Sequence, residues 1–152
     1  MTTALVHLMT HPARPTRSAR EVVPTELWNK QVGLLVRDHP YDSTMAGRVL
    51  DQGYAYLLTA MKHRCESLEL TPSTLVGIGV QTITLDALSY ADLCDRFNGG
   101  HLLHHVPKAE RKYDGSVTRT ATVIASDGWA VDLPLWTDAG ECGPCQPGND
   151  SH

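Results

Sequence analysis

The sequence lacks the long apolar run that a membrane-spanning helix needs, which is roughly 20 consecutive residues. It also lacks, between Met1 and Ala19, a charged stretch followed by an apolar one, so we expect no secretory signal. The 13 Lys and Arg residues are scattered, and the 17 Asp and Glu residues form no runs. Charge therefore indicates no nucleic-acid surface. Together these absences predict a cytoplasmic protein that binds neither membranes nor nucleic acids.

Common catalytic signatures are missing as well. The chain has no Gly-x-Ser-x-Gly motif, no phosphate-binding loop and no paired-carboxylate motif. Gly77 and Gly79 are followed by no third glycine at the spacing of a dinucleotide-binding turn. The 4 cysteines occur without an export signal, which favours free or metal-bound thiols in a reducing compartment over a disulfide framework.

What the chain does contain is a series of helix signals. Its 152 residues fit one domain, and 41% hydrophobic residues are enough to build a core. Apolar periodicity, capping residues and Pro or Gly stops predict helices over 24–38, 42–63, 71–85, 87–97 and 116–128. Thr71 is the predicted cap of the third helix, with Pro72 at its first position. Within that helix, the stretch 80–84 is rich in β-branched residues and also fits a strand.

We therefore predict an all-α, single-domain bundle of about five helices over residues 23–136. Residues 1–22 are rich in Pro and Arg without periodicity, so we predict a flexible N-terminal arm there. Residues 137–152 are predicted to form a tail of Gly, Pro, Asp and Cys. A homodimer is expected if Trp28, Tyr54 and Tyr56 are exposed, because small helical domains often associate through such side chains.

One segment, 90–107, concentrates side chains that donate protons, ligate metals or attack electrophiles near neutral pH. Phe97 lies near the predicted helical face of this segment. Gln81 is a polar residue inside the preceding apolar run, and we expect it to face the same interior. The alternative is that these side chains are ordinary core residues. The chemically active residues of the segment are Tyr90, Cys94, His101, His104 and His105.

The histidines allow two arrangements. In an extended segment His104 and His105 point to opposite sides, so that one of them can face a pocket. On a helix His101 and His105 would share a face at a spacing that suits a metal. The alternative is a buried, hydrogen-bonded structural histidine.

Cys142 and Cys145 form a Cys-x2-Cys pair near the C-terminus. Thioredoxin-type redox chemistry would need a strand before the pair and a helix after it, and the sequence predicts neither. Half of a zinc site is the more plausible interpretation, with His104, His105 or Cys94 completing the tetrahedron. The alternative is a reduced, exposed pair or a disulfide formed in air.

Three stretches, Val76–Leu85, Tyr90–Cys94 and Leu102–Pro107, carry a resemblance to a known family. They resemble a group of small bacterial proteins similar to the glycine-rich domain-containing proteins. The corresponding stretches of that group read Val-Asp-x-x-Trp-His-Thr-Phe-Ile-Leu, Tyr-x-x-Phe-Cys and Phe-Ile-His-His-x-Pro. The resemblance covers residues 23–145 and implies a metal or acid–base centre built from the Trp-His, Tyr/Cys and His-His elements.

This sequence departs from the group's pattern at positions that would affect metal binding. Val80 and Gln81 replace the Trp-His pair, and Gly77 replaces the acidic residue before it. The third cysteine that often follows Cys-x2-Cys in the group is also missing. Because Gln is a poor ligand for zinc or iron, we expect a pocket that has lost its metal and been repurposed.

The first functional hypothesis is an enzyme of bacterial specialised metabolism that tailors a small molecule or modified peptide without a cofactor. It would be a cyclase, isomerase or lyase that uses acid–base chemistry in an apolar pocket. His104 or His105 would be the general base, Tyr90 would donate to developing negative charge, and Gln81 would orient the substrate. The substrate-binding residues would be Gln81, Cys94, Phe97 and His101.

Two alternatives come from other classes. The first is a non-catalytic protein that holds zinc or iron through His104, His105, Cys142 and Cys145. The second is a helical protein-interaction module whose histidines and cysteines belong to the core.

Overall fold

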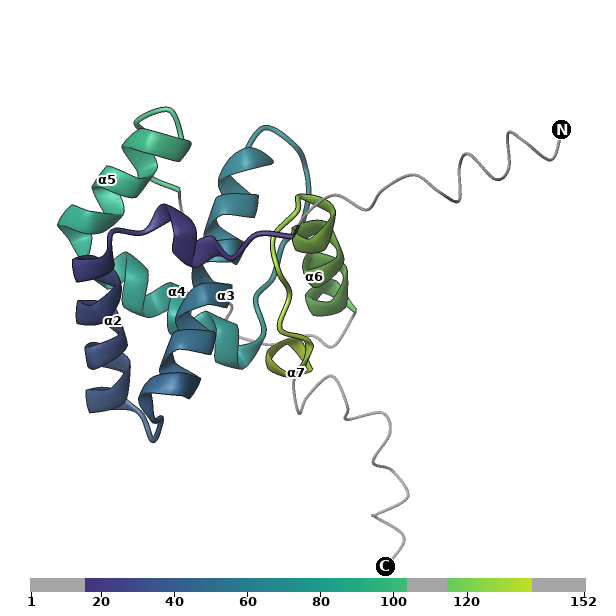
Figure 1. The fold of residues 1–152 in the computed structure, drawn as a ribbon. Coiled ribbons are helices and arrows are strands. Elements are labelled where there is room, and N and C mark those ends of the chain that lie inside the picture. The colour runs from purple at the N-terminus through teal and green to yellow at the C-terminus, as the bar shows by residue number, and fades with distance from the viewer. Residues whose placement is uncertain (1–15, 104–114, 138–152) are drawn as a thin grey trace, which may run out of the picture.

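The computed structural model describes residues 16–103 and 115–137, and over these ranges the only regular elements are helices, as predicted. Figure 1 shows α2 and α5 on one side of the pair α3–α4, with α6 and α7 on the other. Each helix within these ranges is too short or too polar to cross a bilayer. The elements are η1 (Ala19–Val22), α2 (Thr25–Asp38), α3 (Ser43–Lys62), α4 (Thr74–Leu85), α5 (Ala87–Phe97), α6 (Ser116–Ser126) and α7 (Leu133–Trp136).

Helix α3 is the centre of the fold. Its N-cap is Asp42, whose carboxylate accepts a hydrogen bond from the Met45 amide at 2.8 Å. From Val49 to Met61 almost every side chain is buried, including Leu50 and Leu57. Burying each such leucine contributes about 1.5–3 kcal/mol, so α3 supplies much of the core. Helices α2, α4, α5 and α6 and the short η1 all contact it.

The α3–α4 contact is unusually close because glycines face each other. A Cβ atom at Gly53 would lie 2.8 Å from the carbonyl carbon of Gly79, and one at Gly79 would lie 2.5 Å from the Val49 carbonyl oxygen. Neither position can hold a larger residue without backbone movement, so these two glycines permit the helices to touch backbone to backbone.

Helix α4 resolves two sequence expectations. Residues 80–84 are helical and not a strand, because Val76, Val80 and Ile83 form a buried helical stripe against α3. The helix begins two residues later than the predicted cap at Thr71. Ser73 is the true N-cap, since its hydroxyl accepts from the Val76 amide at 3.1 Å.

The predicted flexible arm is wrong for residues 17–22, which are folded. Arg17 pairs with the chain at Trp129, donating to the Gly128 carbonyl at 2.9 Å and accepting from the Ala130 amide at 2.8 Å. Ser18 and Glu21 form a reciprocal capping box that starts η1. The Ser-x-x-Glu pattern was present in the sequence and indicates this short helix.

The three aromatic residues on whose exposure the homodimer prediction depended are buried, and the homodimer itself stays a prediction. Trp28, Tyr54 and Tyr56 are only 5%, 2% and 6% exposed. Trp28 and Tyr54 stack with ring centroids 6.4 Å apart, while the Tyr56 hydroxyl donates to the Leu70 carbonyl. Their apolar rings fill the interior and their polar ends find partners there.

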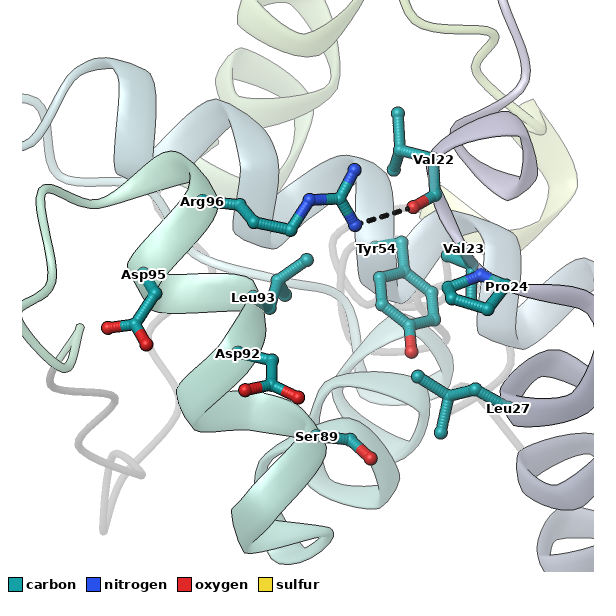
Figure 2. Close-up of a pocket in the computed structure, with 10 residues that line it drawn as sticks. All are labelled: Val22, Val23, Pro24, Leu27, Tyr54, Ser89, Asp92, Leu93, Asp95 and Arg96. Carbon is teal, nitrogen blue, oxygen red and sulfur yellow. Dashed lines mark hydrogen bonds between the residues drawn. The ribbon is translucent and has the colours of Figure 1, made fainter.

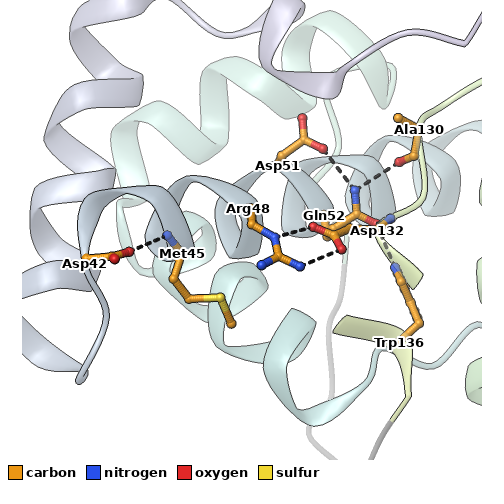
Figure 3. A network of polar contacts seen from close by, with 8 residues as sticks. All are labelled: Asp42, Met45, Arg48, Asp51, Gln52, Ala130, Asp132 and Trp136. Carbon is orange, nitrogen blue, oxygen red and sulfur yellow. Dashed lines mark hydrogen bonds and ion pairs between the residues drawn. The ribbon is translucent and has the colours of Figure 1, made fainter. Parts of the chain in front are cut away.

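Gln52 fastens the C-terminal part of the described fold to α3 (Figure 3). Its amide nitrogen donates to the Ala130 carbonyl at 2.9 Å. Its amide oxygen accepts from the Trp136 indole at 2.7 Å and from the Asp132 amide at 3.1 Å. Arg48 adds a bidentate ion pair to the Asp132 carboxylate, with distances of 2.7 and 2.9 Å.

Candidate functional site

The predicted pair Tyr90 and Cys94 lies together on the buried face of α5. They are 7% and 1% exposed. The Tyr90 hydroxyl donates to the Leu103 carbonyl at 2.7 Å, which ties the segment after α5 back onto the helix. Burial, followed by contact with the Cys94 thiol, raises the pKa of Tyr90 above its usual value. Tyr90 therefore keeps its proton at neutral pH and uses it in the hydrogen bond to the Leu103 carbonyl.

Gln81 does not share this interior, contrary to the expectation. It is exposed on α4 and lines a separate hollow with Lys30, Arg37 and Asp86. The buried stripe of α4 runs through the positions on the other side of the helix, so the polar residue in the apolar run points outward. His101 is exposed and Phe97 is half-buried, with the Arg96 guanidinium 4.9 Å from its ring centroid.

The remaining predicted site residues lie outside the described ranges. These are His104, His105, Cys142 and Cys145. Within residues 16–103 and 115–137, no group of three or more His, Cys, Asp or Glu side chains is arranged to hold a metal ion. The zinc or iron site predicted from the sequence stays a prediction.

A histidine that sequence reasoning missed stands between two carboxylates at the end of α3. His63 Nδ1 lies 2.5 Å from Glu66 Oε2, and Nε2 lies 3.0 Å from Asp127 Oδ2. Lys62 Nζ lies 3.6 Å from the other Asp127 oxygen. The hydrogen bond to Glu66, then the one to Asp127, raises the pKa of His63.

This arrangement favours a structural role for His63. Both ring nitrogens are occupied by carboxylates, so neither is free to take a proton from a substrate. The ring instead connects the end of α3 to Asp127, directly after α6. The His-x2-Glu spacing at a helix terminus was visible in the sequence, but Asp127 lies too far along the chain to be paired with it by any motif.

The described residues form a largely apolar groove of ≈ 360 Å³ between α5 on one side and η1 with the start of α2 on the other (Figure 2). Its volume lies in the range of small-molecule sites, which is about 300–1,000 Å³. Its polar edge is formed by Ser89, Asp92, Asp95 and Arg96. Its apolar lining is formed by Val22, Val23, Pro24, Leu27, Tyr54 and Leu93.

A buried polar chain holds Tyr54 in this lining. The Tyr54 hydroxyl donates to the Gln31 amide oxygen, and the Gln31 amide nitrogen donates to Asp86 at 3.2 Å. Lys30 pairs with the same carboxylate at 3.0 Å. Burial acts to raise the pKa of Asp86, but the hydrogen bonds from Lys30 and Gln31 outweigh it and lower the pKa, so Asp86 is ionised. Burial also raises the pKa of Tyr54, which keeps the phenol neutral.

The charged side chains at the edge of the groove differ in whether they have hydrogen-bond partners. Arg96 reaches across to donate to the Val22 carbonyl at 3.1 Å. Asp92 makes no hydrogen bond or ion pair with any described residue, and in Figure 2 its carboxylate extends toward the groove. The Asp95 carboxylate points away from the groove, toward the loop at Gly100. No sequence motif marks this groove, because it is formed by the way separate helices pack.

Neither models of protein families, nor curated proteins, nor solved structures match this chain.

Proposed function

We propose that this chain binds a small, largely apolar molecule in the groove between α5 and the η1–α2 segment. The observation that carries the proposal is the groove itself, with a volume of ≈ 360 Å³ and a mainly apolar lining that includes Leu27, Tyr54 and Leu93. Excluding water from such a lining is what drives the binding of apolar ligands.

The walls of the groove support this proposal because they are held in place. Tyr54 is fixed by its hydrogen bond to Gln31, and Leu93 is part of the core. Across the groove, η1 is anchored because Asp51 accepts hydrogen bonds from Ser18 at 2.6 Å and from the Arg20 amide at 3.1 Å. Because a preformed site is already ordered, little of the binding free energy is lost in ordering it.

The test is a titration of the full chain with 2-phenylethanol, followed in two-dimensional ¹H–¹⁵N NMR spectra. We expect concentration-dependent shifts of the Val22, Leu27 and Leu93 amides, and no shifts of amides in α6. Ser89→Phe should fill the groove and abolish the shifts. Ser126→Phe on the exposed side of α6 is the matched control and should leave them unchanged. Shifts that survive in Ser89→Phe would place the ligand elsewhere and contradict the proposal.

The reaction predicted from the sequence can be tested on the same sample. An acid–base enzyme that uses His104 or His105 would convert a genuine substrate, and a binding protein would return it unaltered. The tailoring activity in specialised metabolism therefore remains a proposal, as do the metal-binding function and the interaction module.

A further inference from the structure

We infer that the natural ligand of the groove carries a positive charge, as a primary amine does, and that Asp92 is its counter-ion. This inference rests on the proposed function, because it names the class of molecule that the same groove selects.

Asp92 is the only side chain on the polar edge that both reaches toward the groove and has no partner among the described residues. It stands one helical turn from Ser89 and one turn from Arg96, so it occupies the middle of the α5 wall. A carboxylate beside an apolar surface that excludes water interacts more strongly with a cation than one in open solvent does. A ligand with an apolar body and an ammonium group would satisfy both features at once.

The single cation on the edge is directed elsewhere. Arg96 donates to the Val22 carbonyl at 3.1 Å, and its guanidinium lies 4.9 Å from the centroid of the Phe97 ring. These contacts engage one of its five N–H donors and one face of the guanidinium, which are features by which arginine recognises anions.

Beneath the lining, the ionised Asp86 adds negative potential. Its interaction with Tyr54 contributes to the raised pKa of that phenol, after the larger effect of burial. Lys30 neutralises part of this charge. The described lining therefore carries two carboxylates, Asp92 and Asp95, against one cation, Arg96, which is already bonded to Val22. This balance of charge favours a cationic ligand over an anionic one.

Three probes of similar shape test the inference by NMR titration: 2-phenylethylamine, 2-phenylethanol and 3-phenylpropionate. We expect the amine to bind about fivefold more tightly than the alcohol and the carboxylate to bind most weakly. Asp92→Asn should reduce the affinity for 2-phenylethylamine to the affinity measured for 2-phenylethanol. Glu26→Gln removes the same charge from an exposed side chain of α2 that does not line the groove, and it should preserve most of the preference. Added salt should weaken the binding of the amine only.

The outcomes separate the inference from the proposed function. If the alcohol and the amine bind the groove equally well, the groove is a binding site but the counter-ion role of Asp92 is wrong. Tighter binding of 3-phenylpropionate, lost in Arg96→Gln, would assign selectivity to Arg96 and overturn the inference. If none of the probes shifts the groove amides, the proposed function and the inference both fail.

Discussion

Replacing Gly79 by alanine should destabilise the fold, although alanine is the better helix former. The added Cβ would meet the Val49 carbonyl oxygen at 2.5 Å and the Val49 Cγ1 at 3.3 Å. The first of these contacts is with backbone, so no change of side-chain rotamer relieves it. Helices α3 and α4 must therefore separate by roughly half an ångström to one ångström, a gap that forfeits a quarter to a half of the dispersion energy between the facing atoms.

The size of the effect follows from two opposing contributions. Overpacking of a core costs about 1–3 kcal/mol, and the upper end applies here because Val49, Val76 and Val80 are fully buried at this contact. Alanine recovers about 1 kcal/mol over glycine in a helix interior. We expect Gly79→Ala to lower the free energy of unfolding by about 2 kcal/mol.

Urea denaturation followed by circular dichroism at 222 nm measures this change. Gly33→Ala is the matched control, because a Cβ at Gly33 meets nothing within 4 Å, and it should stabilise the chain by up to about 1 kcal/mol. If Gly79→Ala proves as stable as Gly33→Ala, the close backbone contact between α3 and α4 does not exist and the reasoning is refuted.

Three further predictions concern the polar contacts and the metal. Glu66 and Asp127 raise the pKa of His63, so its stabilisation should be fully present below the unfolded pKa of 6.5 and lost as the pH rises through the folded pKa. In urea titrations, His63→Gln should then lower the free energy of unfolding by about 1 kcal/mol near pH 5.5 and by almost nothing near pH 9. Equal losses at both pH values would show that a charged His63 does not stabilise the fold. Gln52→Met should cost about 2–4 kcal/mol because it leaves the Trp136 indole and two backbone groups unpaired, and the exposed Gln81→Met should be nearly neutral. Elemental analysis of protein purified without chelator should find no stoichiometric zinc or iron; one equivalent that is lost in Cys142→Ser/Cys145→Ser would establish the metal site instead.

The helices could be predicted from the sequence where local signals agree. The bounds of α2, α3 and α5 lie within about one residue of expectation, since an apolar stripe coincides there with a cap or a stop such as Pro40. The prediction for α4 was ambiguous because the composition of this helix suits its packing against α3 rather than its own helix propensity. Gly79 weakens the helix signal in the sequence. A glycine is required there because the backbone of α3 lies so close, and no local sequence pattern reveals that contact.

The candidate site was harder to predict because it depends on distant parts of the chain. Tyr90 and Cys94 were placed together correctly, since both lie on one helix. The His63–Asp127 pair and the groove join segments that only the fold brings together, as when Arg96 reaches Val22. Gln81 misled the interpretation because a polar residue in an apolar run can face outward as well as inward.

The pairing of Arg17 with the chain at Trp129 has a consequence for how a ligand could enter the groove. It joins segments near the two ends of the described fold, so its closure carries a large loop entropy and it should be among the first contacts to open. The segment it anchors continues into η1, whose Val22 forms one wall of the groove. Because Ser18 and Arg20 stay bonded to Asp51, fraying of Arg17 would let the approach to this wall adjust to a ligand while η1, α3 and α4 stay packed.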